Sequence, residues 1–200
     1  MTGPALSSLG FIIGTLLNLY AMVVALRFVM QAVRADYYNP IAQFVVRATD
    51  PLLSPMRRII PSVAGYDTSS LLLTFVILAI KLLAFKALSL GAAPAIGSAI
   101  NTAVVAVPPL LYIAFVDLIH LFFNIFIFSL FIQALLSWLP NSQGHPVNGL
   151  LNNITAPILT PVRRFVPPLG GLDLSTLISI IALYAIRIFV VGVLMSFVSG

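Results

Sequence analysis

Two segments of the chain carry the residue types from which a phosphate-binding loop is built. Both follow the pattern P-x-x-x-P-x-R-R-x-x-P, at residues 51–61 and 157–167. Guanidinium groups suit bidentate contact with phosphate, and each basic group near an anionic membrane contributes about 1 kcal/mol of attraction. The candidates for binding anionic lipid headgroups are Arg57, Arg58, Arg163 and Arg164. A second interpretation stays open, in which these arginines only set the topology and anchor the loops at the interface.

An aspartate follows each arginine pair, at Asp67 and Asp173, directly before an apolar run. This position predicts a helix N-cap, because a carboxylate there accepts hydrogen bonds from free backbone N–H groups at the positive helix end. Pairing with the arginines of the same or the other loop is the alternative.

Ionisable groups also lie inside long apolar runs, where they cost a few kcal/mol or more unless paired, snorkelled or hydrated. At about 1.5 Å per residue, Asp117, Lys81 and Arg187 lie at similar depth, with His120 near them. We therefore expect Asp117 to pair with Lys81 or Arg187. One acid among several bases favours a structural bridge, and an ion or proton pathway is the alternative.

The residue inventory argues against catalysis and cofactors. The chain has no cysteine and no glutamate, so thiolate metal sites, iron–sulfur clusters and cysteine nucleophiles are excluded. A Ser-His-Asp set around Asp117 and His120 has no nucleophile elbow or oxyanion motif beside it. We expect no enzyme, no metal site and no cofactor.

The composition defines the elements that must hold these residues. The chain is 60% hydrophobic and 8% charged, against about 25% charged residues in soluble domains. This indicates an integral membrane protein and excludes a nucleic-acid binder, although the net charge is +5. Four apolar runs reach the roughly 20 residues of a spanning helix, at about residues 5–33, 69–90, 109–139 and 174–198. In the first, Gly10 and Gly14 predict close helix packing, within the chain or between chains.

A duplication organises the whole chain. A constant offset, from Pro51 to Pro157, aligns the two proline–arginine segments without gaps and also pairs Lys81 with Arg187. Each unit is a span, a loop and a span, so the two repeats are parallel and both loops lie on one face. The units are repeat 1 at 1–91 with its loop at about 34–68, an apolar linker at 92–108, and repeat 2 at 109–200 with its loop at about 140–173.

The loops and the linker differ in character. Each loop begins with an amphipathic segment suited to a membrane surface, from Pro40 and from Pro146, and the prolines that follow predict a kinked path that blocks a long helix. The linker is uncharged and rich in Ala, Val, Gly and Ser. We expect a short interfacial helix there, with a re-entrant segment as the alternative.

Charge sets the expected orientation. The loop arginines lie on one face, and the termini and linker are almost bare of Lys and Arg. The positive-inside rule then places both Arg-Arg loops in the cytoplasm and both termini outside.

The proline–arginine motif resembles the YggT family of small bacterial membrane proteins and the related YlmG proteins of plastids. The residues that carry the resemblance are Tyr38-Asn39-Pro40, residues 49–61, Gly65-Tyr66-Asp67 and their second copy through Gly170-Gly171-Leu172-Asp173. It implies a bacterial inner-membrane protein linked with osmotic tolerance and potassium uptake, with photosynthetic relatives linked to division, nucleoid distribution and cytochrome b6 haem attachment. It implies no catalytic residues. Ala156 stands where the family usually has an aspartate, as at Asp50.

The expected fold is an all-α membrane protein of two tandem parallel repeats, each made of two transmembrane helices joined by an amphipathic cytoplasmic loop. The expected function is a non-enzymatic scaffold or modulator of membrane complexes that binds anionic lipids. The alternatives are an ion (potassium) transport or channel accessory, and an assembly or cell-division factor. Expected partners are anionic lipids and a membrane protein, with an oligomer left open and no nucleic acid.

Overall fold

The computed structural model of the chain describes residues 4–63, 65–137, 146–165 and 174–199. These residues form six helices and one hairpin: α1 (Pro4–Ala32), α2 (Pro40–Arg57), α3 (Thr68–Ala87), β1 (Ala92–Ala95), β2 (Ser98–Asn101), α4 (Val107–Ser137), α5 (Pro146–Phe165) and α6 (Leu174–Ser199). Helices α1, α3, α4 and α6 are long and apolar enough to cross a membrane. They begin and end close to the bounds predicted for the four spans.

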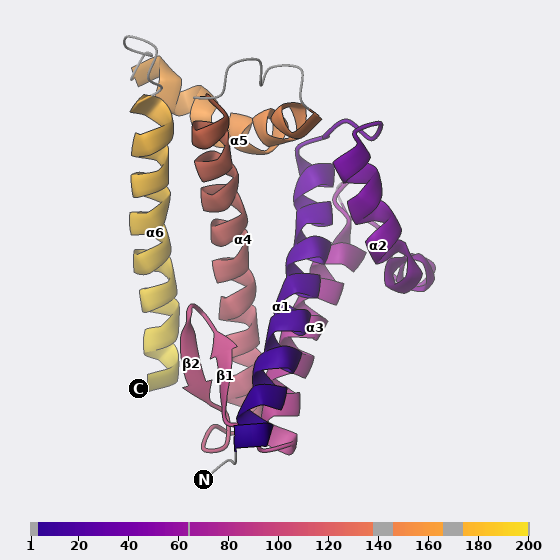
Figure 1. Cartoon of the computed structure of the whole chain (residues 1–200), viewed down its shortest axis with the longest axis vertical. Helices are drawn as coiled ribbons and strands as arrows, with labels where there is room; N and C mark the ends of the chain where they lie inside the picture. The colour runs from indigo at the N-terminus through magenta and orange to yellow at the C-terminus, as the bar shows by residue number, and fades with distance from the viewer. Residues whose placement is uncertain (1–3, 64, 138–145, 166–173, 200) are drawn as a thin grey trace.

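In Figure 1, α6 and α4 stand beside α1 and α3, which overlap in this view, and α2 and α5 lie toward the same end of the molecule. Within each repeat the two spans pack on each other, α1 on α3 and α4 on α6, and the contact of α3 with α4 joins the repeats. At the shared end, the Nδ2 of Asn39 donates to the carbonyl of Pro146 at 2.6 Å. Both loops therefore lie on one end of the bundle.

Helices α2 and α5 correct the prediction that the loop prolines block a long helix. Pro51 and Pro55 lie inside α2, and Pro157 and Pro161 lie inside α5. Each proline removes one backbone donor and disfavours a straight helix, and α2 bends in its second half (Figure 1). Its apolar face nevertheless stays buried on both sides of Pro51, at Val45 and Leu53, and this packing explains why the helix continues past that proline.

The linker between the repeats is a β-hairpin, so the predicted short interfacial helix is wrong and the fold is not purely α. Ala92 pairs with Asn101 and Ala95 with Ser98 in antiparallel register. The turn residues Ile96 and Gly97 both have positive φ, at 55° and 71°, as the type I′ turn of tight hairpins requires. Strand β1 contacts α1, α3 and α4, so the hairpin packs against three of the four long helices.

Small residues make this packing possible. A Cβ on Gly10 would lie 2.9 Å from the carbonyl oxygen of Leu90, and one on Gly14 would lie 2.9 Å from the Cγ of Pro94. Ala93 and Ala95 on the hairpin are buried as well. The small-residue face of α1 is thus occupied within the chain.

Candidate functional site

A buried arginine holds α2 against α1. The guanidinium of Arg27 donates to the carbonyl of Val46 at 3.1 Å and to Oγ1 of Thr49 at 2.6 Å, and it pairs with Asp50 at 2.8 Å. Arg27 is only 7% exposed, so these three acceptors replace the water it has lost. Arg27 was not among the residues predicted to form a site.

The second repeat makes the same connection without charge. At the repeat offset, Gln133 stands for Arg27 and Thr155 for Thr49. Oγ1 of Thr155 donates to Oε1 of Gln133 at 2.5 Å, and Nε2 of Gln133 donates to Asn152 at 2.6 Å. This accounts for Ala156 in place of an aspartate, because no arginine is left there to neutralise.

A second ion pair connects the end of α2 with the start of α3. Arg57 pairs with Asp67, which is the N-cap of α3 and accepts a hydrogen bond from the backbone N–H of Ser70 at 3.3 Å. Asp67 therefore fills both roles considered for it, N-cap and partner of a loop arginine. Burial raises the pKa of the Asp67 carboxyl, but hydrogen bonds from Arg57 and Ser70 and the charge of Arg57 outweigh it, so its pKa lies below the ordinary 3.8. Asp173 lies outside the described residues.

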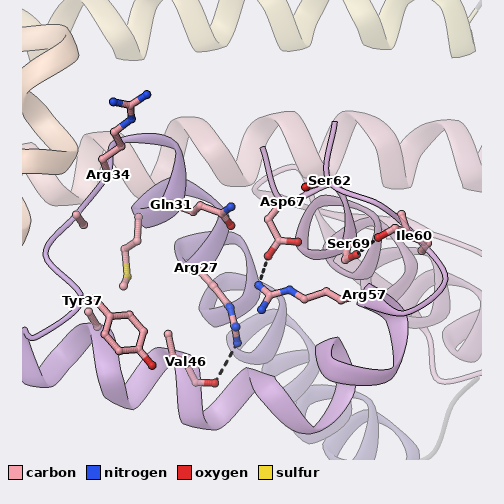
Figure 2. Close-up of a pocket in the computed structure, with 13 residues that line it drawn as sticks. Arg27, Gln31, Arg34, Tyr37, Val46, Arg57, Ile60, Ser62, Asp67 and Ser69 are labelled. Carbon is pink, nitrogen blue, oxygen red and sulfur yellow. Dashed lines mark hydrogen bonds and ion pairs between the residues drawn. The ribbon is translucent and has the colours of Figure 1, made fainter. Parts of the chain in front are cut away.

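These residues surround a pocket of about 520 Å³ between the ends of α1, α2 and α3. Arg27, Arg57 and Asp67 form its centre, and Arg34 and Tyr37 stand at its edge (Figure 2). Of the four arginines predicted to bind headgroups, only Arg57 lines it. Arg58, Arg163 and Arg164 are exposed at the ends of α2 and α5.

Deep between the spans, Lys81 is completely buried. Its Nζ lies 2.7 Å from Oδ2 of Asp117 and donates to Oδ1 of Asn18 at 2.7 Å. Oδ1 of Asp117 accepts a hydrogen bond from the backbone N–H of Ile96, at 2.7 Å. Of the two partners proposed for Asp117, the structure brings Lys81 to it, and this one pair joins α1, α3, α4 and the hairpin turn.

Arg187 occupies the matching position in the second repeat but meets neutral groups. It bonds to the side-chain oxygen of Asn124 and lies over the ring of Tyr184, 4.2 Å from its centroid. Asn124 also contacts Nδ1 of His120 at 3.3 Å. At the repeat offset Asn124 corresponds to Asn18, so a contact between an asparagine and a basic side chain occurs in both repeats, and neither asparagine was predicted as a site residue.

A groove of about 970 Å³ runs along this polar layer between α1, the hairpin and α4. Asn18, Asp117, His120 and Asn124 lie on its wall. Among residues 4–63, 65–137, 146–165 and 174–199, no group of three or more His, Cys, Asp or Glu is arranged to hold a metal ion.

Fold and sites together define a multi-pass helical membrane protein made by tandem duplication. The CCB3/YggT family model matches the chain twice, over residues 6–88 and 112–194, with the offset seen within the sequence. The chain belongs to the CCB3/YggT family.

Two bacterial relatives are matched over most of their length, and a chloroplastic relative over a quarter of its own. An uncharacterized protein of Vibrio alginolyticus is 40% identical over 179 residues, covering 89% of this chain and 90% of its own. The uncharacterized protein YggT of Escherichia coli K12 is 35% identical over 192 residues, covering 94% and 92%. The chloroplastic YlmG homolog protein 2 of Arabidopsis thaliana is 39% identical over 64 residues, 32% of this chain and 25% of its own. No solved structure matches the chain.

Proposed function

We propose that the protein is a non-enzymatic scaffold of the bacterial inner membrane that holds anionic lipids at its arginine-bearing end and thereby modulates neighbouring membrane complexes. The observation that carries the proposal is the pair of amphipathic helices α2 and α5 at one end of the bundle (Figure 1). Each helix ends in an arginine pair. This end faces the cytoplasm, as the positive-inside rule requires.

The surface of both helices suits an interface between headgroups and acyl chains. Phe44, Ile59 and Phe165 are large apolar residues with 67%, 84% and 85% of their surface exposed, beside the exposed Arg58, Arg163 and Arg164. Apolar side chains of an interfacial helix enter the acyl boundary while basic groups reach anionic headgroups. A scaffold of this kind needs no reacting groups, and osmotic tolerance is the setting in which we place it.

The test replaces Arg57, Arg58, Arg163 and Arg164 with glutamine. Protein purified in neutral detergent is exposed to equal amounts of phosphatidylglycerol and phosphatidylcholine, and the retained lipids are quantified. We expect the wild type to enrich phosphatidylglycerol and the variant to lose that enrichment. The matched control carries lysine at the same four positions, which keeps the charge and should keep most of the enrichment. Unchanged lipid selectivity in the glutamine variant would remove the lipid role.

A second candidate is an accessory role in ion transport, favoured by the groove beside Asp117, His120 and Asn124. A hydrated path past Lys81 would give flux of potassium or protons in proteoliposomes, altered by Asp117→Asn. Flux that is absent from the pure protein would leave only an accessory role.

A further inference from the structure

We propose that the pocket between α1, α2 and α3 is a specific site for one phosphate-ester group, the headgroup of an anionic phospholipid. The inference rests on the proposed function and narrows it to a single site in the first repeat. The volume of about 520 Å³ falls within the usual range of small-ligand sites, roughly 300–1,000 Å³.

The lining gives the pocket an excess of positive charge. Arg27, Arg34 and Arg57 line it, and Asp67 is the one acid in its described lining. Arg27 and Arg57 are held in place by their pairs with Asp50 and Asp67. Two arginines are thus pre-positioned, and guanidinium groups form strong, frequently bidentate hydrogen bonds with phosphate.

Arg34 supplies the uncompensated charge. Its side chain makes no hydrogen bond or ion pair within the part of the chain that the structure describes, and it is exposed at the pocket edge with its guanidinium turned outward (Figure 2). Its backbone has a φ of 52°, because it follows the end of α1 in a left-handed C-cap in which the Ala35 N–H donates to the carbonyl of Met30 at 2.8 Å. Rotation of this long side chain brings its charge over a bound phosphate.

The second repeat shows that this set of arginines is not a requirement of the repeat fold. Gln133 and Pro140 stand at the positions of Arg27 and Arg34. Gln133 still connects α4 to α5 through Thr155. The fold of the unit therefore needs a polar group at that position but no arginine, and the charged pocket is an addition of the first repeat.

The place of the pocket favours a lipid over free phosphate. It lies at the arginine-bearing end, where α1 and α3 meet the amphipathic helix α2 (Figure 1). Met30, Val46 and Ile60 lie in the same lining, so a glycerol ester finds apolar contacts beside the arginines.

The test measures binding to the full chain in neutral detergent by native mass spectrometry. The probes are dioctanoyl phosphatidylglycerol, dioctanoyl phosphatidylcholine and inorganic phosphate. We expect one tightly held phosphatidylglycerol per chain, at least about 10-fold stronger than phosphatidylcholine, and about 10-fold weaker binding in Arg34→Gln, as for a loss of one charged contact to phosphate. Arg47→Gln is the matched control: Arg47 is exposed on α2 outside the lining, and its variant should stay within about 2-fold of the wild type.

A double variant, Arg27→Gln with Asp50→Ala, copies the second repeat and leaves no buried charge unpaired. It should fold and should lose the tight lipid as Arg34→Gln does. Equal weakening by Arg34→Gln and Arg47→Gln would overturn the pocket and leave a diffuse charged surface, with the proposed function intact. The pocket would also be overturned if lipid selectivity were lost only in the variant that replaces Arg57, Arg58, Arg163 and Arg164 with glutamine, and not in Arg34→Gln or in the double variant. Inorganic phosphate that displaces the lipid at equal concentration would keep the phosphate site and make free phosphate its ligand.

Discussion

Lys81 is the largest side chain that the described part of the protein buries completely. A lone ammonium at that depth would be costly, but Asp117 and Asn18 both accept from it and Ile96 satisfies the second oxygen of Asp117. The hydrogen-bonding groups around this ion pair come from four different elements, so the pair fixes the positions of α1, α3, α4 and the hairpin relative to one another.

Breaking this pair on one side should cost far more than replacing both sides. We expect Lys81→Met to lower the free energy of unfolding by roughly 3–5 kcal/mol, because it leaves the Asp117 carboxylate buried without its cation. Asp117→Leu should cost a similar amount. The double variant should recover most of the loss, and thermal unfolding in detergent of all four proteins gives the coupling energy. Losses that simply add would show that the two charges do not stabilise each other.

Asp67 stabilises the start of α3 in two ways, as its N-cap and as the partner of Arg57, and two substitutions distinguish these contributions. An asparagine side chain caps a helix as well as an aspartate does, so Asp67→Asn should keep the cap and lose the pair with Arg57 and the hydrogen bond that the Ser70 hydroxyl donates to Oδ2. Asp67→Ala should also lose the cap, a further loss of roughly 0.5–2 kcal/mol. The lowered pKa of Asp67 means that its carboxylate stabilises the fold above the ordinary value of 3.8. That stability is lost as the pH falls through the lower folded pKa.

Unfolding measured from pH 6 down to pH 3 should show a smaller acid-induced loss in Asp67→Asn than in the wild type. Asp36 is exposed and Asp36→Asn serves as the control, with an acid profile close to the wild type. Superimposable profiles for Asp67→Asn and the wild type would mean that the Asp67 carboxylate contributes nothing to folding.

The sequence identified the buried acid and its two candidate bases, because a charged residue in a long apolar run is conspicuous. It did not distinguish Lys81 from Arg187, since depth along a helix says nothing about rotation or neighbours. Arg27 was missed because an arginine near the end of an apolar run is also what snorkelling to the interface produces. The offset that aligns Arg27 with Gln133 was the signal that could have found it.

Among the elements, the secondary structure of the linker depends on tertiary packing and could not be predicted from its local sequence pattern. The linker 91–108 has no alternating strand pattern, and alanine-rich sequence favours helix. Its hairpin is held by the hydrogen bond from Ile96 to Asp117 and by burial of Ala93 against the helices, both tertiary effects. The four spans, in contrast, were visible because hydropathy alone defines them.

The packing of α1 against the hairpin gives a test with an internal control. Gly14→Ala would place a Cβ 2.9 Å from Cγ of Pro94 and 3.1 Å from the ring of Phe85, so we expect a loss of about 1–3 kcal/mol from overpacking. Gly192→Ala in α6 has nothing within 4 Å of its new Cβ and should be neutral or stabilising by up to about 1 kcal/mol. Thermal unfolding of both variants compares them, and equal effects would show that the hairpin does not restrict α1.

For the whole molecule, duplication has not produced a closed two-fold arrangement. Helix α3 packs against both α1 and α4, whereas its counterpart α6 packs on α4 and α5 and lies at the outer edge of the molecule (Figure 1). The two helices differ in burial: 56% of the residues in the apolar stretch of α3 are buried, against 6% of those in α6. Most of α6 is therefore left uncovered by the described part of the chain.

The orientation of this molecule can be tested because the chain has no cysteine, so one introduced thiol is the only reactive one. Arg58 and Arg164 are exposed on α2 and α5, and Val104, 79% exposed, follows the hairpin toward the opposite end. We expect a membrane-impermeant maleimide to label Val104→Cys in intact spheroplasts. Arg58→Cys and Arg164→Cys should be labelled only after lysis, because the positive-inside rule places both arginine loops in the cytoplasm.

The pattern of labelling distinguishes the duplication from the orientation. Arg58→Cys and Arg164→Cys reacting from opposite sides would contradict the parallel duplication itself, since an even number of spans separates them. Both reacting from outside would preserve the duplication and reverse only the orientation. The phosphate pocket would then open to the periplasm, and phosphatidylglycerol of the outer leaflet would be its lipid.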